Sequence, residues 1–178
     1  EIINNQKKIN QFDYFFVPTI NQYIIDTLKV YGIRKNQLID SQKYKHIKAD
    51  KIFFLENIYL KSGKFQKQFE NIPKNITKSI RKKLLKYKGK KFKFDKIFID
   101  RSDSKFTHYQ LHNNKKIIKK LKKNKFGIFK LSTLNIFDQI SLFNSAKLVL
   151  GLHGAGFANV IFCKKNTKIY EILKKSDK

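Results

Sequence analysis

Apolar positions along this chain occur in two patterns: short continuous runs, and sets spaced as on one face of a helix. Continuous runs are typical of buried strands, and a spacing of three and four residues is typical of amphipathic helices. The runs predict strands at residues 13–17, 51–55, 96–99, 127–130 and 168–172, together with an apolar run that begins at Leu148. The spaced sets predict a helix between Asn21 and Gly32 and helices at residues 74–88, 113–125 and 136–146.

From about Phe92 onward the predicted strands and helices alternate. Parallel strands joined through helices need right-handed crossovers, and these place helices on both faces of the sheet. The sequence therefore predicts an α/β fold with a parallel sheet. Residues 86–93 are mostly lysine, glycine and aromatic residues, as in a connection between lobes, so we predict two domains at residues 1–90 and 91–178.

The stretch from Leu148 to Asn159 concentrates the candidate chemistry, because an apolar run is followed by glycines and a histidine. It predicts a strand, a glycine turn and the start of a helix. Glycines let the backbone approach a ligand closely, and the first N–H groups of a helix favour an anion such as phosphate. The alternative is a tight turn whose glycines serve packing only. His153 favours the phosphate hypothesis, because a structural turn does not need a side chain that donates or accepts protons.

Two common phosphate-binding motifs do not fit this stretch. A dinucleotide fingerprint requires a third glycine where the chain has Asn159, and it normally follows the first strand of its unit. A P-loop requires a Gly-Lys pair followed by serine or threonine, and the sequence has none.

A second candidate site follows the strand at 96–99, where Asp100, Arg101, Ser102 and Asp103 are consecutive. Ligand-binding groups gather at the carboxyl ends of parallel strands, although aspartate and serine are also ordinary residues of exposed turns. Glu171 lies near the end of the last predicted strand. It is either paired or bound to hydroxyl groups, or it is a solvated residue on an edge strand.

The net charge of +27 at first indicates a nucleic-acid partner. Only three of the 40 basic residues are arginine, however, whereas phosphate and groove contacts favour the arginine fork. Abundant lysine, isoleucine, asparagine and phenylalanine are also expected from AT-rich codons. We therefore interpret most lysines as solvated surface and nucleic acid as a disfavoured partner; the alternative is an anionic partner such as an acidic membrane surface, an acidic glycan or RNA.

The sequence contains no methionine, even at position 1, so we expect a fragment or a processed product. Its apolar runs are too short to cross a bilayer. The single cysteine, Cys163, cannot form an intrachain disulfide, which fits a reducing compartment. We expect a cytoplasmic protein. The alternative is a cytoplasmic protein that also associates with an acidic membrane surface.

Several short motifs, taken in order, resemble glycosyltransferase family 61. They are Ile97-Phe-Ile-Asp-Arg101-Ser, Asp138-Gln139-Ile with Phe143, Ala146-Lys147, His153-Gly-Ala-Gly156 with Asn159, and Thr167-Lys-Ile-Tyr-Glu171. The family includes O-linked N-acetylglucosaminyl transferases, plant xylosyltransferases and bacterial members associated with surface polysaccharides. The resemblance implies a GT-B arrangement of two Rossmann-like lobes, here part of the first and the whole of the second. It also implies a nucleotide-sugar donor bound mainly by the second lobe, with no metal and no other cofactor.

The chain departs from the family pattern in two places. Where the family has a basic residue followed by Asn-Glu, this chain has Phe106-Thr-His108-Tyr and Asn113-Asn114, so that asparagine replaces the glutamate. The more N-terminal part of the family, where such enzymes place the base and the acceptor groove, is not represented.

The resemblance and the residue types together predict an inverting glycosyltransferase acting on a glycan or protein hydroxyl. We assign Arg101, His153 and the N–H groups of residues 154–156, including Ala155, to the diphosphate of the donor. Ser102 is a lesser helper at the diphosphate, and Glu171 is the candidate for binding the ribose hydroxyls. Gln139 and Asn159 are expected to hold the loop and helix in place more than to touch the ligand. His108 is a candidate base. The rival hypothesis is a basic Rossmann-like module that binds RNA or an acidic surface without catalysis.

Overall fold

A computed structural model describes residues 9–53, 74–103 and 114–173 of the chain. The chain divides into two compact units, Glu1–Lys83 and Leu84–Lys178. No helix in these described ranges is both long and apolar enough to span a membrane.

The first unit contains a small parallel β-α-β arrangement. Strand β1 (Phe15–Val17) pairs with β2 (Leu38–Asp40), and α2 (Gln22–Lys29) and a 3₁₀ turn, η2 (Lys35–Gln37), connect them. Asn21 caps α2 by accepting a hydrogen bond from the Ile24 N–H at 3.0 Å, as the sequence predicts. The chain leaves the helix through Gly32, whose φ of 84° favours glycine.

The predicted strand at 51–55 is wrong in its described part, because residues 51–53 have no regular structure. Ile52 and Phe53 are 62% and 72% exposed, so the described part of this apolar run is not buried in a sheet. Leu38–Asp40 forms the second strand instead, and Leu38 is buried. An apolar run alone does not form a strand unless a partner strand supplies the hydrogen bonds.

Helix α3 (Lys74–Leu84) ends four residues before the predicted Lys88. The following backbone bonds to helix α5 (Ile136–Ser145) instead of continuing α3. The Gly89 N–H donates to Ser141 Oγ at 2.8 Å, and the Lys90 N–H donates to Asp138 Oδ1 at 2.7 Å. A Cβ atom at Gly89 would lie 2.4 Å from the carbonyl of Phe137, so this close approach requires glycine.

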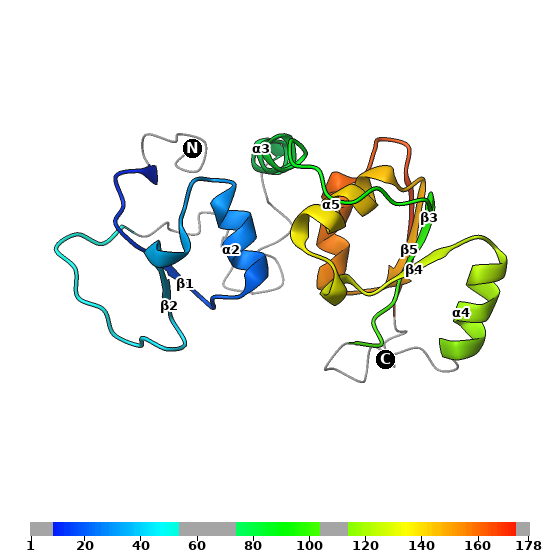
Figure 1. Cartoon of the computed structure of the whole chain (residues 1–178), viewed down its shortest axis with the longest axis horizontal. Helices are drawn as coiled ribbons and strands as arrows, with labels where there is room; N and C mark the ends of the chain where they lie inside the picture. Colours follow the sequence, from blue (N-terminus) through cyan, green and yellow to red (C-terminus); the bar gives the residue numbers. More distant parts are fainter. Residues whose placement is uncertain (1–8, 54–73, 104–113, 174–178) are drawn as a thin grey trace. The chain divides into compact units, whose positions relative to one another are not determined.

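The second unit contains a four-stranded sheet in the order β4-β3-β5-β6, with every pair parallel. Its strands are β3 (Lys96–Ile99), β4 (Gly127–Phe129), β5 (Leu148–Leu152) and β6 (Lys168–Ile172), and its other elements are α4 (Asn114–Lys123), α5, and the 3₁₀ helices η5 (Leu131–Thr133) and η6 (Ala155–Phe162). Helix α4 lies on one side of this sheet and α5 on the other (Figure 1). The parallel α/β fold expected from the sequence is confirmed.

The core of the second unit lies between the central strands and α5. β3 and β5 occupy the middle of the sheet, and Ile97, Phe98 and Val149 are almost fully buried. Ile140 and Phe143 of α5 are equally inaccessible. This packing fixes the two central strands, whose carboxyl ends carry the candidate site.

Candidate functional site

The carboxyl ends of all four parallel strands of the second unit lie at one edge of the sheet. Residues 100–103 follow β3, and residues 153–156 follow β5. η5 follows β4, and Glu171 lies within the last two residues of β6. The register pairs Ile99 with Gly151 and Gly151 with Glu171, so segments that are distant in sequence meet there. The structure therefore brings together the two candidate stretches and Glu171.

Arg101 joins the end of β3 to the glycine turn after β5. Its Nη1 donates a hydrogen bond to the carbonyl oxygen of His153. The guanidinium lies so close to Gly154 that a Cβ atom there would be 2.2 Å from Nη1. Gly154 also has φ 154°, a conformation that side chains disfavour. The backbone conformation thus favours glycine at 154, and a side chain there would displace the guanidinium of Arg101.

His153 and Glu171 form a second direct link, between β5 and β6. Nδ1 of His153 lies 2.7 Å from Oε1 of Glu171, and the two side chains are 55% and 34% exposed. An ionised carboxylate only accepts hydrogen bonds, so Nδ1 donates in this pair. The His153 N–H also donates to the Ile172 carbonyl at 3.0 Å, which fixes its backbone. Glu171 therefore orients the imidazole ring.

The segment after the glycine turn is a 3₁₀ helix rather than the ordinary helix that the sequence suggests. Its first bond runs from the Phe157 N–H to the Gly154 carbonyl at 2.9 Å. The N–H groups of Ala155 and Gly156 precede that bond, and the first N–H groups of a helix have no partner within it. The tighter helix still begins with backbone donors at the strand edge.

Asn159 and Gln139 hold the surrounding elements together. Both are buried, and Asn159 Nδ2 donates to Gln139 Oε1 at 2.9 Å. The amide of Gln139 donates in turn to the carbonyls of Leu131 and Leu134, each at 3.0 Å. These bonds connect η6 with α5 and with the segment after β4.

Ser102 lies beside Asp100 and not beside the glycine turn. Its hydroxyl donates to Asp100 Oδ2 at 2.9 Å, and its N–H donates to Oδ1 at 3.0 Å. Asp100 is buried and also accepts from Asn114 Nδ2 at 3.4 Å. Ser102 therefore closes the turn after β3. His108 lies outside the described residues.

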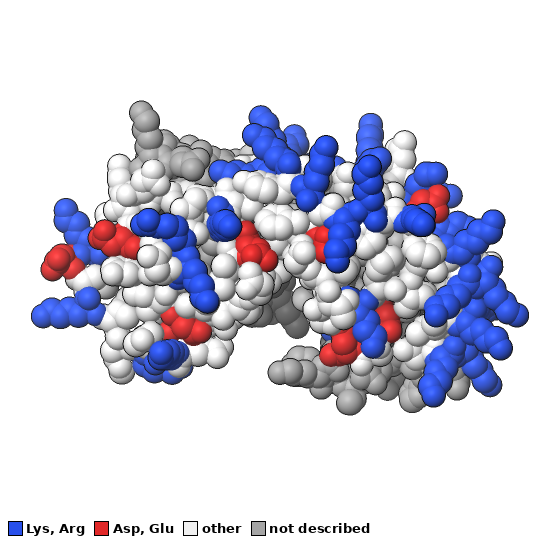
Figure 2. Space-filling model, in the orientation of Figure 1, with Lys and Arg blue, Asp and Glu red and all other residues white. Residues whose placement is uncertain are grey.

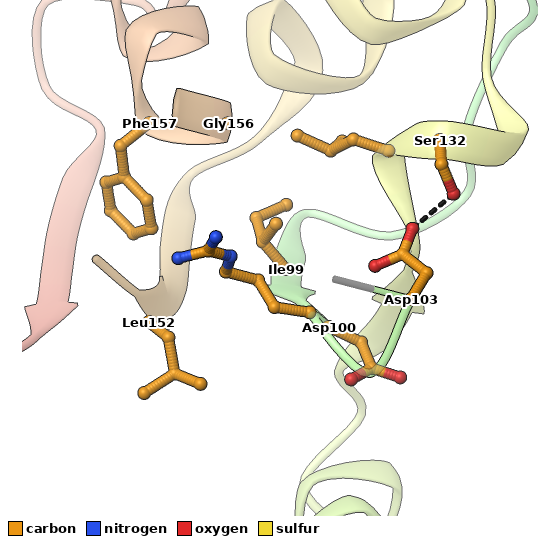
Figure 3. Close-up of a pocket in the computed structure, with 9 residues that line it drawn as sticks. Ile99, Asp100, Asp103, Ser132, Leu152, Gly156 and Phe157 are labelled. Carbon is orange, nitrogen blue, oxygen red and sulfur yellow. Dashed lines mark hydrogen bonds between the residues drawn. The ribbon is translucent and has the colours of Figure 1, made fainter. Parts of the chain in front are cut away.

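A cavity of about 200 Å³ opens beside Arg101, between the ends of β3, β4 and β5. Figure 3 shows Phe157 and Leu152 on one side of it, and Asp103 and Ser132 on the other. Its lining consists of Ile99, Asp100, Arg101, Asp103, Leu131, Ser132, Leu152, Gly156 and Phe157. The sequence reasoning missed Ser132, although its position just after the strand at 127–130 was a usable signal.

Positive charge gathers elsewhere in the second unit, on helix α4. The helix carries six exposed lysines, and a group of blue side chains covers the region where α4 lies (Figure 2). None of these lysines forms an ion pair with a described residue. The described residues also include no group of three or more His, Cys, Asp or Glu side chains placed to hold a metal ion.

Comparison with known families agrees with the motif resemblance. A family model described as Glycosyltransferase 61 matches residues 8–170. No curated protein and no solved structure matches the chain. The family match covers most of the sequence and includes both segments that meet at the strand edge.

Proposed function

The chain belongs to glycosyltransferase family 61, and we propose that it transfers a sugar from a nucleotide-diphosphate donor to a glycan or protein hydroxyl with inversion of configuration. One observation carries this proposal. Arg101, His153 and the start of η6 are held together at one edge of the sheet by direct contacts. A cation, an imidazole and backbone N–H groups in one place form a suitable site for a diphosphate.

In the proposed reaction the acceptor oxygen attacks the anomeric carbon from the face opposite the diphosphate. The bond between that carbon and the phosphate oxygen breaks, its electron pair stays on the leaving diphosphate, and the hydroxyl proton passes to a base. Negative charge thus builds on the diphosphate in the transition state. Fixed donors aimed at that charge lower the barrier, and Arg101 with the N–H groups of residues 154–156 supplies them.

His153 adds a donor whose direction is set by its partner. With Nδ1 bonded to Glu171, the second ring nitrogen, Nε2, is the one that can donate to the diphosphate when the ring is protonated. Glu171 therefore acts first through His153, and its second carboxylate oxygen is our candidate acceptor for a ribose hydroxyl.

The guanidinium and the N–H groups supply the kind of charge stabilisation that a metal supplies in other transferases, so we propose a metal-independent reaction. His108 stays our candidate for the base. A thermal-shift panel of nucleoside diphosphates and nucleotide sugars on the full-length protein tests the donor class. Activity that is retained in a chelator, and a product whose anomeric NMR signals show inversion, test the mechanism.

The six lysines of α4 favour a second candidate, a module that binds RNA or an acidic membrane surface without catalysis. Salt distinguishes the two functions. A surface that releases counterions loses affinity steeply between low and physiological salt, whereas a small pocket with few charge contacts loses much less. Tight RNA or vesicle binding with that steep dependence, and no nucleotide-sugar binding, would favour the module.

A further inference from the structure

The cavity beside Arg101 has walls of opposite charge. Arg101 and Asp103 line it; Asp100 lines it as well, but its carboxylate accepts hydrogen bonds from Ser102 and Asn114. A phosphate is attracted to the guanidinium of Arg101 and repelled by the carboxylate of Asp103. Whatever part of a ligand lies against Asp103 should therefore be uncharged and should carry hydrogen-bond donors.

The size and the remaining lining of the cavity narrow the ligand further. Pockets for drug-sized molecules have volumes of about 300–1,000 Å³, so about 200 Å³ accommodates a single ring and not a whole nucleotide sugar. Ile99, Leu131, Leu152 and Phe157 give the cavity apolar surface between its polar groups. A sugar ring combines both requirements, since it has C–H faces and a rim of hydroxyl donors.

The order of strands gives the donor a direction across the sheet. In the order β4-β3-β5-β6, the diphosphate donors follow the central strands β3 and β5. Glu171 lies on one side of them, on β6, and Ser132 lies on the other side, just after β4. If Glu171 binds the ribose, the far end of the diphosphate points toward the cavity.

We propose that this cavity is the subsite for the transferred sugar, in which Asp103 and Ser132 bind its hydroxyl groups and Asp103 contributes to sugar specificity. The inference rests on the proposed function. The Ser132 hydroxyl donates to Asp103 Oδ2, which fixes the carboxylate. Figure 3 shows the other carboxylate oxygen of Asp103 turned toward the interior of the cavity. An ionised carboxylate accepts several hydrogen bonds, and bonds to a charged acceptor are stronger than neutral ones.

The test is calorimetric binding by the full-length protein of UDP, UDP-xylose, UDP-N-acetylglucosamine, GDP and GDP-mannose. We expect D103N to weaken the nucleotide sugar that the parent prefers by about tenfold and to leave its nucleoside diphosphate within about twofold. The matched control is D95N. It removes the same charge before β3, at the opposite edge of the same sheet, and should change neither affinity.

The outcomes separate this inference from the proposed function. An equal loss for the diphosphate and the nucleotide sugar would place the nucleoside in the cavity and overturn the sugar subsite. Unchanged affinities in D103N would overturn it as well. A parent that binds none of the five probes would overturn the proposed function itself. If D103N melts far below the parent, S132A provides the same comparison, because it removes the second hydroxyl-binding group.

Discussion

Arg101, His153 and Glu171 form a strand-edge cluster whose charges are held in place, whereas the charges of helix α4 are not. In the cluster, Arg101 bonds to the backbone after β5 and His153 bonds to Glu171. On α4, six lysines extend from one exposed helix, and none pairs with a described carboxylate. The cluster has few charges whose positions are fixed by other groups, whereas α4 has many charges on flexible side chains.

The difference indicates which charges can act on a reacting bond. A fixed donor is already oriented when charge develops, so none of its effect is lost to reorganisation. An exposed ammonium group is hydrated, and salt screens its field within about 10 Å at ordinary ionic strength. When one lysine is removed, the neighbouring lysines supply the same charge. The net charge of +27 is therefore a poor guide to catalysis. The fixed positions of Arg101, His153 and Glu171 at one sheet edge are a better one.

The largest effect should come from His153→Ala, with Lys122→Ala on α4 as the matched control. Loss of a donor to the leaving diphosphate should cost about 2–4 kcal/mol, or about a hundred- to a thousandfold in rate. Lys122→Ala should stay within about twofold, because its charge is exposed and redundant. Turnover of a nucleotide sugar by the full-length enzyme at fixed salt measures both.

Both variants must melt close to the parent, since a collapsed turn would mimic a catalytic loss. Equal rates for the two variants would refute the role of His153. A larger loss in Lys122→Ala than in His153→Ala would favour the charge-driven binding module.

The next effect should come from Gly154→Ala. The new Cβ atom would overlap the guanidinium of Arg101, and the backbone at φ 154° would add about 1–3 kcal/mol of strain. A guanidinium is the flexible end of its side chain, so Arg101 should move, and a shift of about 1 Å in a catalytic group can cost about a hundredfold in rate. Rate and unfolding free energy should be measured in the Arg101→Ala background as well. If Gly154→Ala lowers the rate equally in both backgrounds, the contact with Arg101 is irrelevant.

Much of this cluster could be predicted from sequence because strand ends are easy to locate. Apolar runs identified β3, β4 and β6, and parallel strands must end at one edge. The pairing of His153 with Glu171 could not be predicted, since residues on neighbouring strands have no sequence signature of contact. The strand expected at 51–55 is wrong over the described residues 51–53 for a related reason, because a run of apolar residues contains no information about its partner strand.

Glu171→Gln should have a smaller effect than loss of His153. Glutamine keeps the shape of the side chain, but its neutral amide oxygen accepts from Nδ1 more weakly than a carboxylate does, so the ring is held less firmly. In other sites, loss of a group that orients a histidine costs about 10–100-fold, and we expect a loss near the lower end because His153 keeps its backbone bond to Ile172. Nitrogen NMR of the His153 ring should show a weaker hydrogen bond at Nδ1. An unchanged ring spectrum would contradict the orienting role, whatever the rate.

The smallest effect should come from Asp95→Asn. The charge of Asp95 is exposed, like the lysines of α4, but it is paired, like the charges at the strand ends. Asp95 Oδ2 lies 3.2 Å from Lys147 Nζ, and this hydrogen bond holds the pKa of Asp95 below the ordinary value of an aspartate side chain. A lowered folded-state pKa means that the pair stabilises the fold above the unfolded pKa, and that the contribution disappears as the pH falls through the folded-state pKa.

The amides of Lys147 and Leu148 both bond to the Asp95 carbonyl, so their hydrogen exchange reports the local stability. Parent and variant should be compared at equal pH, which cancels the intrinsic exchange rate. The parent should exchange slightly more slowly at pH 7, and the difference should vanish in acid. A difference that persists well below pH 3.8 would show that the substitution acts through the backbone instead of the charge.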